Sequence, residues 1–333
     1  MVDRTRSKIL IREYNEDKDV KMVRKLERNS EIGAKKVVSI FTNMMGDPLS
    51  RIRFFPLRVM LVAELLESKE LVGVVRGVIK NVGTLSGSLL KMGYILGLRV
   101  SPSYRRKGVA LRLIAAVEEW MVRNGAEYAF LATEKDNDAS KNLFTIKCNY
   151  VNLSSLVIFV QPISSITKHI SRDIKIEKVD IDLAISLYRR TLKTKDLYPL
   201  DMDVILKEKL SVGTWVSYYK REGWLNLRSK VDNEEDLISS ETSNSSWGEN
   251  LGELMESMWR FTSRVGEGMR DCKVFITELG FGDPLANHVP QTDSISCIDD
   301  LWYTKRLSTH VDENIDEILM RQVGNVFVDP RDF

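Results

Sequence analysis

Residues 94–123 read YILGLRVSPSYRRKGVALRLIAAVEEWMVR, and this stretch decides the fold. It opens with an apolar run at 94–100, which is typical of a buried strand, and a Ser-Pro pair ends that run. A basic turn containing one glycine follows at 105–108. From Val109 to Arg123 apolar residues return at every fourth position, which predicts an amphipathic helix with one buried face. The stretch therefore predicts a strand, a basic turn and a helix in direct succession.

The segments on either side continue this alternation of strands and helices. The expected strands are 9–12, 58–65, 70–80, 128–132 and a strand pair within 151–160, and the expected helices are 17–28 and 137–147. The order β-α-β-β-β-α-β-α-β predicts an α/β (α+β) fold with a mixed central sheet. We expect residues 1–165 to form this domain and to bind its ligand on their own.

Residues 170–333 repeat part of the pattern more weakly, which predicts a second, truncated lobe of the same kind. The expected elements are strands at 174–177, 213–219 and 273–279 and helices at 181–193 and 251–266. Residues 229–250 are rich in Asp, Glu, Ser and Asn, and we interpret them as a flexible acidic linker. The second half has no counterpart of the basic turn.

Charge is distributed unevenly along the 333 residues. The whole chain has a formal charge of only +2, but residues 1–162 hold 27 Lys+Arg and 17 Asp+Glu, whereas the remainder holds 22 and 30. The basic half lacks the interleaved aromatic residues of a base-stacking surface, so direct nucleic-acid binding is not expected. This nucleic-acid module is the weakest of the functions that we consider.

Composition also excludes several classes of protein. No apolar stretch approaches the roughly 20 residues of a membrane-spanning helix, and no secretory signal follows Met1, so we expect no membrane association. Three widely spaced cysteines without a CxxC pair argue against a disulfide framework or a zinc site, and three scattered histidines predict no metal centre. The expected location is the nucleus or the cytoplasm.

The basic turn has the chemistry of a phosphate site. At the start of a helix several backbone N–H groups lack acceptors and lie at the positive end of the helix dipole. Glycine in the turn permits close approach, and the neighbouring cations add a positive field. The expected cofactor contacts here are Arg105, Arg106, Lys107, Gly108, Val109 and Ala110.

Short motifs spread over most of the chain resemble the hookless-type plant N-acetyltransferases of the GNAT superfamily. They include residues 96–102, 118–120, 124–128, 132–134, 136–137, 139–140, 142–145, 300–302, 305–307 and 326–333. The resemblance implies a central sheet of GNAT type and acetyl-CoA as co-substrate. It also implies an amine acceptor, such as a lysine-bearing protein like a histone, and a role in plant growth regulation.

The resemblance also suggests how the site is arranged. The backbone of Leu98 and Val100 would flank the pantetheine arm of the cofactor, while Asn137 would contact the cofactor or cap the following helix. Tyr94 stands where many members carry a glutamate base, and it either orients a water or packs. Glu134 is the other candidate catalytic group, since a carboxylate there could accept protons through water.

Two readings of the activity remain open from the residues alone. Phe144 stands where the superfamily places a tyrosine acid, and a phenyl ring cannot donate a proton. The favoured function is an acetyl-CoA-dependent N-acetyltransferase. The alternative is a non-catalytic acyl-CoA-binding regulatory protein.

Overall fold

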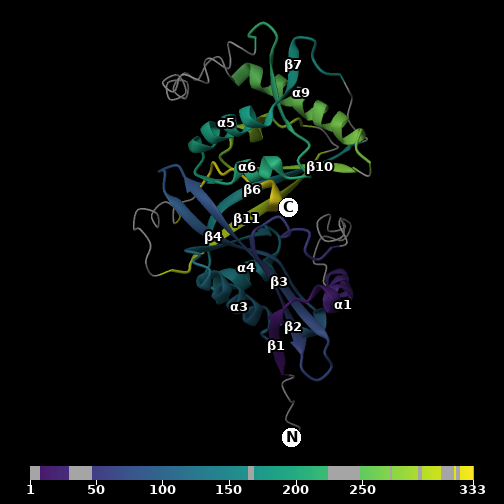
Figure 1. Ribbon diagram of the computed structural model, residues 1–333, viewed down its shortest axis with the longest axis vertical. Coiled ribbons are helices and arrows are strands. Elements are labelled where there is room, and N and C mark those ends of the chain that lie inside the picture. Colours follow the sequence, from purple (N-terminus) through teal and green to yellow (C-terminus); the bar gives the residue numbers. More distant parts are fainter. Residues whose placement is uncertain are drawn as a thin grey trace.

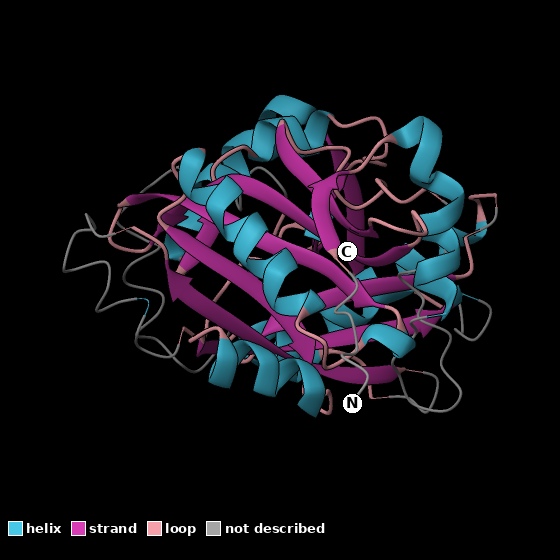
Figure 2. Ribbon diagram, turned by 90° about the horizontal axis from the view of Figure 1, so that it is seen from below, coloured by secondary structure: helices cyan, strands magenta, loops and turns pink. Residues whose placement is uncertain are grey.

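A nine-stranded mixed sheet runs through the molecule and carries helices on both of its faces (Figure 1, Figure 2). The computed structural model describes residues 8–29, 47–163, 169–223, 248–270, 272–291, 295–308, 319 and 323–332. The strand order is β1-β2-β3-β4-β5-β11-β6-β10, with β8 paired to β3, and β7 and β9 form a separate two-stranded sheet. The strands are β1 Ile9–Glu13, β2 Leu57–Leu65, β3 Leu71–Thr84, β4 Leu89–Val100, β5 Tyr128–Glu134, β6 Val151–Pro162, β7 Ile174–Val179, β8 Leu197–Pro199, β9 Thr214–Tyr219, β10 Val274–Gly280 and β11 Ser296–Arg306. The helices are α1 Glu16–Asn29, α3 Val109–Arg123, α4 Asp138–Asn142, α5 Ile181–Thr191, α6 Met202–Lys207 and α9 Gly248–Glu267.

Helix α3 covers one face of the sheet and packs unusually close to it. Its stripe of buried apolar residues faces β2, β3 and β4. Two strand glycines permit the close approach: a Cβ on Gly77 would lie 2.5 Å from Cγ2 of Val117, and one on Gly93 would lie 2.4 Å from Sδ of Met121. The short distance between these strands and α3 is therefore possible only because Gly77 and Gly93 have no side chain.

The opposite face of the sheet is covered by α1 and by the C-terminal segment, residues 323–332. Val23 and Leu26 of α1 belong to the same buried cluster as Tyr94, Phe130 and Trp302 of the sheet. Figure 1 shows the C-terminus in the middle of the molecule, beside the sheet, whereas the N-terminus lies at one end. The last residues of the chain therefore lie against the strands that the first half supplies.

Strand β11 joins the two halves of the sequence. It lies between β5 and β6 and pairs antiparallel with both, and β10 then pairs with the other edge of β6. The boundary that the sequence predicts at residues 165–170 is thus crossed by the sheet, because strands from the second half complete the sheet of the first. How each part behaves alone stays a prediction.

The rest of the second half forms a smaller layer above this sheet (Figure 1). Helix α9 packs on β7, β9 and β10, and its Trp259 contacts Phe159 and Phe275 edge to face. The expected flexible linker at 229–250 lies outside the described residues except for its last three, which begin α9. No helix of the described part of the chain is long and apolar enough to span a bilayer.

The order of elements predicted for the first half is confirmed, including the bounds of α3. Two details were wrong. The expected strand pair within 151–160 is the single strand β6, because β11 and β10 provide its neighbours from elsewhere in the chain. The expected helix at 137–147 ends at Asn142 and continues as one wide π-helical turn, Leu143–Lys147.

Candidate functional site

Strands β4 and β5 pair over only part of their length. They are parallel neighbours at Met92–Ile95 and Tyr128–Leu131, yet β4 continues to Val100 and β5 to Glu134. A bulge in the pairing of β3 with β4, and a positive φ of 57° at Gly97, bend β4 away from β5. Beyond the last pair, the edge of β4 that faces β5 is therefore open for backbone hydrogen bonds with a ligand.

Leu98 and Val100 lie on this open part of β4, and both side chains are half-buried. This is the position from which their backbone would flank a pantetheine arm. The basic turn and α3 follow directly, so the open strand edge leads into the start of the helix.

The start of α3 presents a row of backbone amides. In this fully described stretch, the backbone amides of residues 106–111 have no acceptor within the protein. The next amide, that of Arg112, donates to the carbonyl oxygen of Gly108 at 3.2 Å. Gly108 has φ of +81°, and a Cβ built on it would meet nothing within 4 Å. The turn is therefore an open cradle of unpaired N–H groups, which fits a pyrophosphate.

The side chains of the turn leave this cradle free. Nε of Arg105 donates to the carbonyl oxygen of Val100 at 3.3 Å, and Nζ of Lys107 lies 4.7 Å from the centroid of the Tyr104 ring. Arg106 has a positive φ of 60°, which is uncommon for a residue with a Cβ and marks a tightly shaped turn. The three cations surround the amides and supply the positive field that a diphosphate needs.

Asn137 begins α4 on the other side of the groove. Its Oδ1 accepts a hydrogen bond from the amide of Ser140 at 3.1 Å, so the side chain caps the helix. A direct contact between Asn137 and the cofactor stays a prediction.

Phe144 lies in the π-helical turn after α4 and is 3% exposed. Its ring meets that of Tyr150 edge to face, with 5.3 Å between centroids. The Tyr150 hydroxyl donates to Oε1 of Glu118 at 2.8 Å, and burial, together with Glu118, raises its pKa well above 10. The phenol nearest to Phe144 is thus engaged elsewhere and is a weak acid.

Tyr94 is buried on the face of the sheet opposite α3. Its ring stacks on Phe130 at 5.6 Å between centroids and meets Trp302 edge to face at 6.1 Å, and Nζ of Lys80 lies 4.1 Å from its centroid. Burial, and then the nearby Asp332 carboxyl, raise the Tyr94 pKa well above 10. A phenol in this setting is a poor base at neutral pH, and its contacts are those of a core residue.

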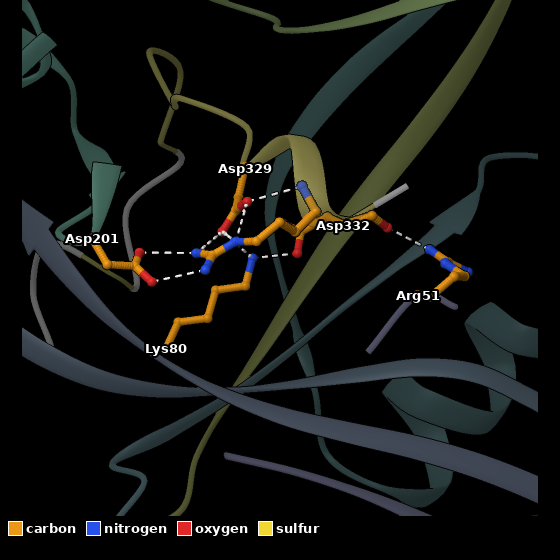
Figure 3. A network of polar contacts seen from close by, with 6 residues as sticks. Arg51, Lys80, Asp201, Asp329 and Asp332 are labelled. Carbon is orange, nitrogen blue, oxygen red and sulfur yellow. Dashed lines mark hydrogen bonds and ion pairs between the residues drawn. The ribbon is translucent and has the colours of Figure 1, made fainter. Parts of the chain in front are cut away.

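The C-terminal segment brings a charged network to the same face (Figure 3). Lys80 of β3 pairs with Asp332 and, at 3.1 Å, with Asp329. Arg331 forms a two-pronged ion pair with Asp201, at 2.8 and 2.9 Å, and also bonds Asp329. Although burial opposes ionisation of Asp329, Lys80 and Arg331 lower its pKa to about 2.

Three carboxyl groups near this network have raised pKa values. Burial raises the pKa of Asp332 to about 6. Burial, and then the neighbouring Asp300, raise the pKa of Glu278 to about 8. Burial, and then Glu134, raise the pKa of Asp300 to about 7. The face opposite α3 therefore holds carboxyl groups that change charge near neutral pH, which is the range that general acid–base chemistry requires.

Glu134 lies at the end of β5, exposed and directly opposite Asp300 in the strand register. It is thus close to the gap between β4 and β5, but its catalytic role stays a prediction. Within the described ranges, no three His, Cys, Asp or Glu side chains come together as ligands for a metal ion.

Comparisons with known proteins identify the family. Residues 42–150 match the acetyltransferase (GNAT) family. The chain is 32% identical to "Probable N-acetyltransferase HLS1-like" of Arabidopsis thaliana, over 97% of this chain and 98% of the relative. The chain belongs to the GNAT acetyltransferases. It is also 27% identical to "Acetyl transferase GW6a" of Oryza sativa subsp. japonica, over 98% of this chain and 97% of that protein.

A solved structure shares the GNAT fold over most of the chain. The glucosamine N-acetyltransferase region of a fungal multi-domain GH3 β-N-acetylglucosaminidase has a TM-score of 0.56 at 14% identity, covering 89% of this chain and 38% of that one. The alignment with the Arabidopsis relative spans 412 positions, whereas this chain has 333 residues, so the relative carries segments that this GNAT enzyme lacks. Acetyl-CoA is the co-substrate, and the amide cradle and the strand gap fit it.

Sequence reasoning missed the carboxyl groups on β10 and β11. Asp300 and the last eight residues were noticed only as family motifs, and Glu278 was not singled out. Nothing in the local pattern around Asp300 indicates that β11 enters the sheet beside β5. The nearest signal is Asp300 itself, a charged residue between Ile298 and Trp302 on the same strand face.

Proposed function

We propose that this GNAT acetyltransferase transfers the acetyl group of acetyl-CoA to an amine of a protein acceptor, such as a histone lysine, in the regulation of plant growth. The observation that carries the proposal is the continuity of the amide cradle at Gly108 with the open edge of β4. The Arabidopsis and rice relatives support the plant setting. The nucleus or the cytoplasm is the proposed location.

A cationic acceptor is favoured by charge. Residues 163–333 hold 30 acidic and 22 basic residues, and β10 and β11 of this half form part of the face of the sheet opposite α3. Opposite charge steers an acceptor such as a lysine-rich tail towards this face. The other face carries α3 and the cofactor cradle.

In this proposal the residues of the groove mainly bind and orient. The amides that precede Arg112 would hold the pyrophosphate, and each charge-assisted hydrogen bond contributes on the order of 1.5 to 3 kcal/mol. The backbone at Leu98 and Val100 would align the thioester in the strand gap. Transfer then requires an uncharged amine, because only a nitrogen with a free electron pair can attack the carbonyl carbon. The new C–N bond forms as the C–S bond breaks.

The proposal is tested by supplying labelled acetyl-CoA with a panel of histones, lysine-bearing peptides and polyamines. We expect label on an amine of at least one protein acceptor, and mass spectrometry identifies the nitrogen. Enzyme heated beyond unfolding is the control for non-enzymatic acetylation. Binding of CoA without transfer to any member of the panel contradicts the proposal.

The second candidate is a regulatory protein that binds acyl-CoA without turnover. It is favoured by the absence of a hydroxyl at Phe144 and by the burial of Tyr94. Phe144→Tyr distinguishes the two candidates: if the enzyme turns over and thiolate protonation is slow, we expect turnover to rise severalfold with CoA affinity unchanged. Phe159→Tyr, a buried ring in the other layer, is the control for adding a buried hydroxyl. No transfer by the wild type or by Phe144→Tyr supports the regulatory protein.

A further inference from the structure

Asp300 of β11 lies one strand away from the gap between β4 and β5, because β11 pairs with the other edge of β5, and it is on the face that α3 does not cover. It is opposite Glu134 on β5, three residues beyond Leu131, which makes the last pairing with β4. Side chains alternate along a strand, so Asp300 shares the face of Trp302, and Trp302 contacts the Tyr94 ring. The carboxyl therefore lies on the face of the sheet opposite α3, beside the end of β5 that borders the gap.

The Asp300 carboxyl is buried without a complete set of partners. The residue is 9% exposed, and among the described residues no group donates a hydrogen bond to its Oδ1. Buried polar atoms are nearly always paired, so an unpaired carboxylate oxygen at this place needs an explanation. An unpaired carboxylate oxygen of this kind can accept a proton from a bound ligand.

A second buried polar atom points to a ligand at the same place. Nε of Arg51 is buried and also has no partner in the described part of the chain, although its Nη2 donates to the carbonyl oxygen of Asp332 at 2.5 Å. Arg51 lies near Asp300 and lines a small pocket on the same side of β4. The pocket is lined by Glu27, Asp47, Pro48, Ser50, Arg51, Arg76, Gly97 and Arg99.

We propose that Asp300 is the catalytic base that takes the proton from the acceptor's ammonium group. This inference rests on the proposed acetyl transfer. Many GNAT enzymes have a glutamate base on β4, where this chain has Tyr94. Because Tyr94 cannot act as the base, the role passes to a residue on β11, a strand from the second half of the chain. Glu278, which interacts with Asp300 from β10, is partly exposed.

The proton and electron balance of the step is simple. The Asp300 carboxylate accepts one proton from R–NH3⁺ and leaves R–NH2, whose electron pair forms the C–N bond with the thioester carbonyl. The C–S bond breaks with its electron pair on sulfur, and the second nitrogen proton goes to that thiolate. The products are the acetylated amine and CoA thiol, and Asp300 returns its proton to water.

The charged groups around Asp300 suit this role. Glu134 flanks it from the neighbouring strand β5, Glu278 interacts with it from β10, and Arg51 is the cation that faces it. Burial, and then Glu134, raise its pKa to about 7, whereas Arg51 lowers it. Asp300 is therefore partly ionised at neutral pH and can accept a proton.

The test compares Asp300→Asn with Asp299→Asn, using acetyl-CoA with spermine and with a lysine-bearing histone peptide as probes. Asp299 is the neighbouring residue, points to the other face and makes only an exposed ion pair with Lys135 at 3.2 Å. We expect Asp300→Asn to lower kcat by about 10²- to 10⁴-fold while the Kd for CoA stays within about twofold. Asp299→Asn should behave as wild type, and Asp300→Glu should retain part of the activity.

The pH profile separates a catalytic from a structural role. With Asp300 as base, kcat/KM of the wild type rises through about pH 7 and then levels off. In Asp300→Asn the rate should instead rise without a plateau from pH 6 to 9, because only amine that is already uncharged reacts. Loss of kcat with an unchanged plateau, or no loss at all, overturns the inference. If the wild type acetylates neither probe nor any member of the wider panel, the proposed function itself fails, and the base assignment fails with it.

Discussion

At the scale of single residues, the most informative position is Gly108. Its φ is +81°, and among the described residues nothing lies within 4 Å of a Cβ built there, which leaves space for the proposed ligand. The other informative residues are three buried carboxyls near the Lys80 network, Glu278, Asp300 and Asp332. Keeping a buried carboxyl charged costs free energy.

Gly108→Asp should abolish CoA binding by filling the cradle with a like charge while the protein stays folded. Asp at a positive φ costs roughly 1 kcal/mol by itself. Gly87→Asp controls for that cost, because Gly87 has φ of +82° and also has nothing within 4 Å, but lies in the β3–β4 turn. Calorimetric titration with CoA measures both variants. Equal affinities for the two would contradict the assignment of the cradle.

Stability should fall as the pH rises from 5 to 8.5. Asp332, Glu278 and Asp300 have folded pKa values of about 6, 8 and 7, above their unfolded values near 4. Their protonated forms favour folding, so this stabilisation is complete below about pH 4 and is lost as the pH rises through 6 to 8. Asp329 acts in the opposite sense, losing stability only as the pH falls from about 4 to 2.

Urea unfolding at a series of pH values measures this effect. We expect a lower midpoint at pH 8.5 than at pH 5, and Asp300→Asn should remove on the order of 2 kcal/mol of the difference. A midpoint that rises over this range would show that the carboxyls are not desolvated.

At the scale of elements, α3 was predicted to the residue and β11 was not predicted at all. The apolar stripe of α3 repeats at every fourth position over fifteen residues, and this period indicates a helix and not a strand. β11 carries Asp299 and Asp300 in its middle, which breaks the apolar pattern, and a strand's neighbours depend on contacts far away in sequence. The sequence could therefore predict the turn and helix that form the candidate cofactor site, but not the strand that carries Asp300.

The close packing of α3 makes its own prediction. Gly77→Ala should destabilise the protein by roughly 1 to 3 kcal/mol, because the new methyl group meets a β-branched side chain, Val117, that has little freedom to move. Any shift of α3 also moves the cradle, so CoA affinity should fall as well. Gly252→Ala in α9 is the control, since a Cβ there meets only His288 Nδ1, at 3.6 Å. Thermal unfolding and CoA titration measure both variants, and equal behaviour would show that α3 can adjust.

At the scale of the whole molecule, the site is shared between the two halves of the chain. The cradle belongs to the first half, whereas Asp300, Glu278 and the partners of Lys80 come from the second. Sequence periodicity identified strands and helices but not which strands are neighbours. The sequence therefore predicted a division at residues 165–170, although β10 and β11 join the sheet of the first half.

Contrary to the expectation from the sequence, residues 1–163 alone should not form a stable cofactor-binding unit. Without β11, the facing edges of β5 and β6 have no partner, and Lys80 is left without its two carboxylates. We expect a fragment that aggregates or unfolds without cooperativity, and co-expression of residues 164–333 as a second chain should restore CoA binding. A fragment that unfolds cooperatively and binds CoA as the full chain does would show that the first half folds independently.

The place of β11 also determines when the enzyme can come into being on the ribosome. The middle of the sheet forms only after residues 296–306 have been synthesised. The ion pairs of Lys80 form only after residues 329–332 have been synthesised. Until residues 296–306 have left the ribosome, the nascent chain displays unpaired edges on β5 and β6, which chaperones must shield from other nascent chains. A stop codon before residue 296 therefore leaves the sheet without β11.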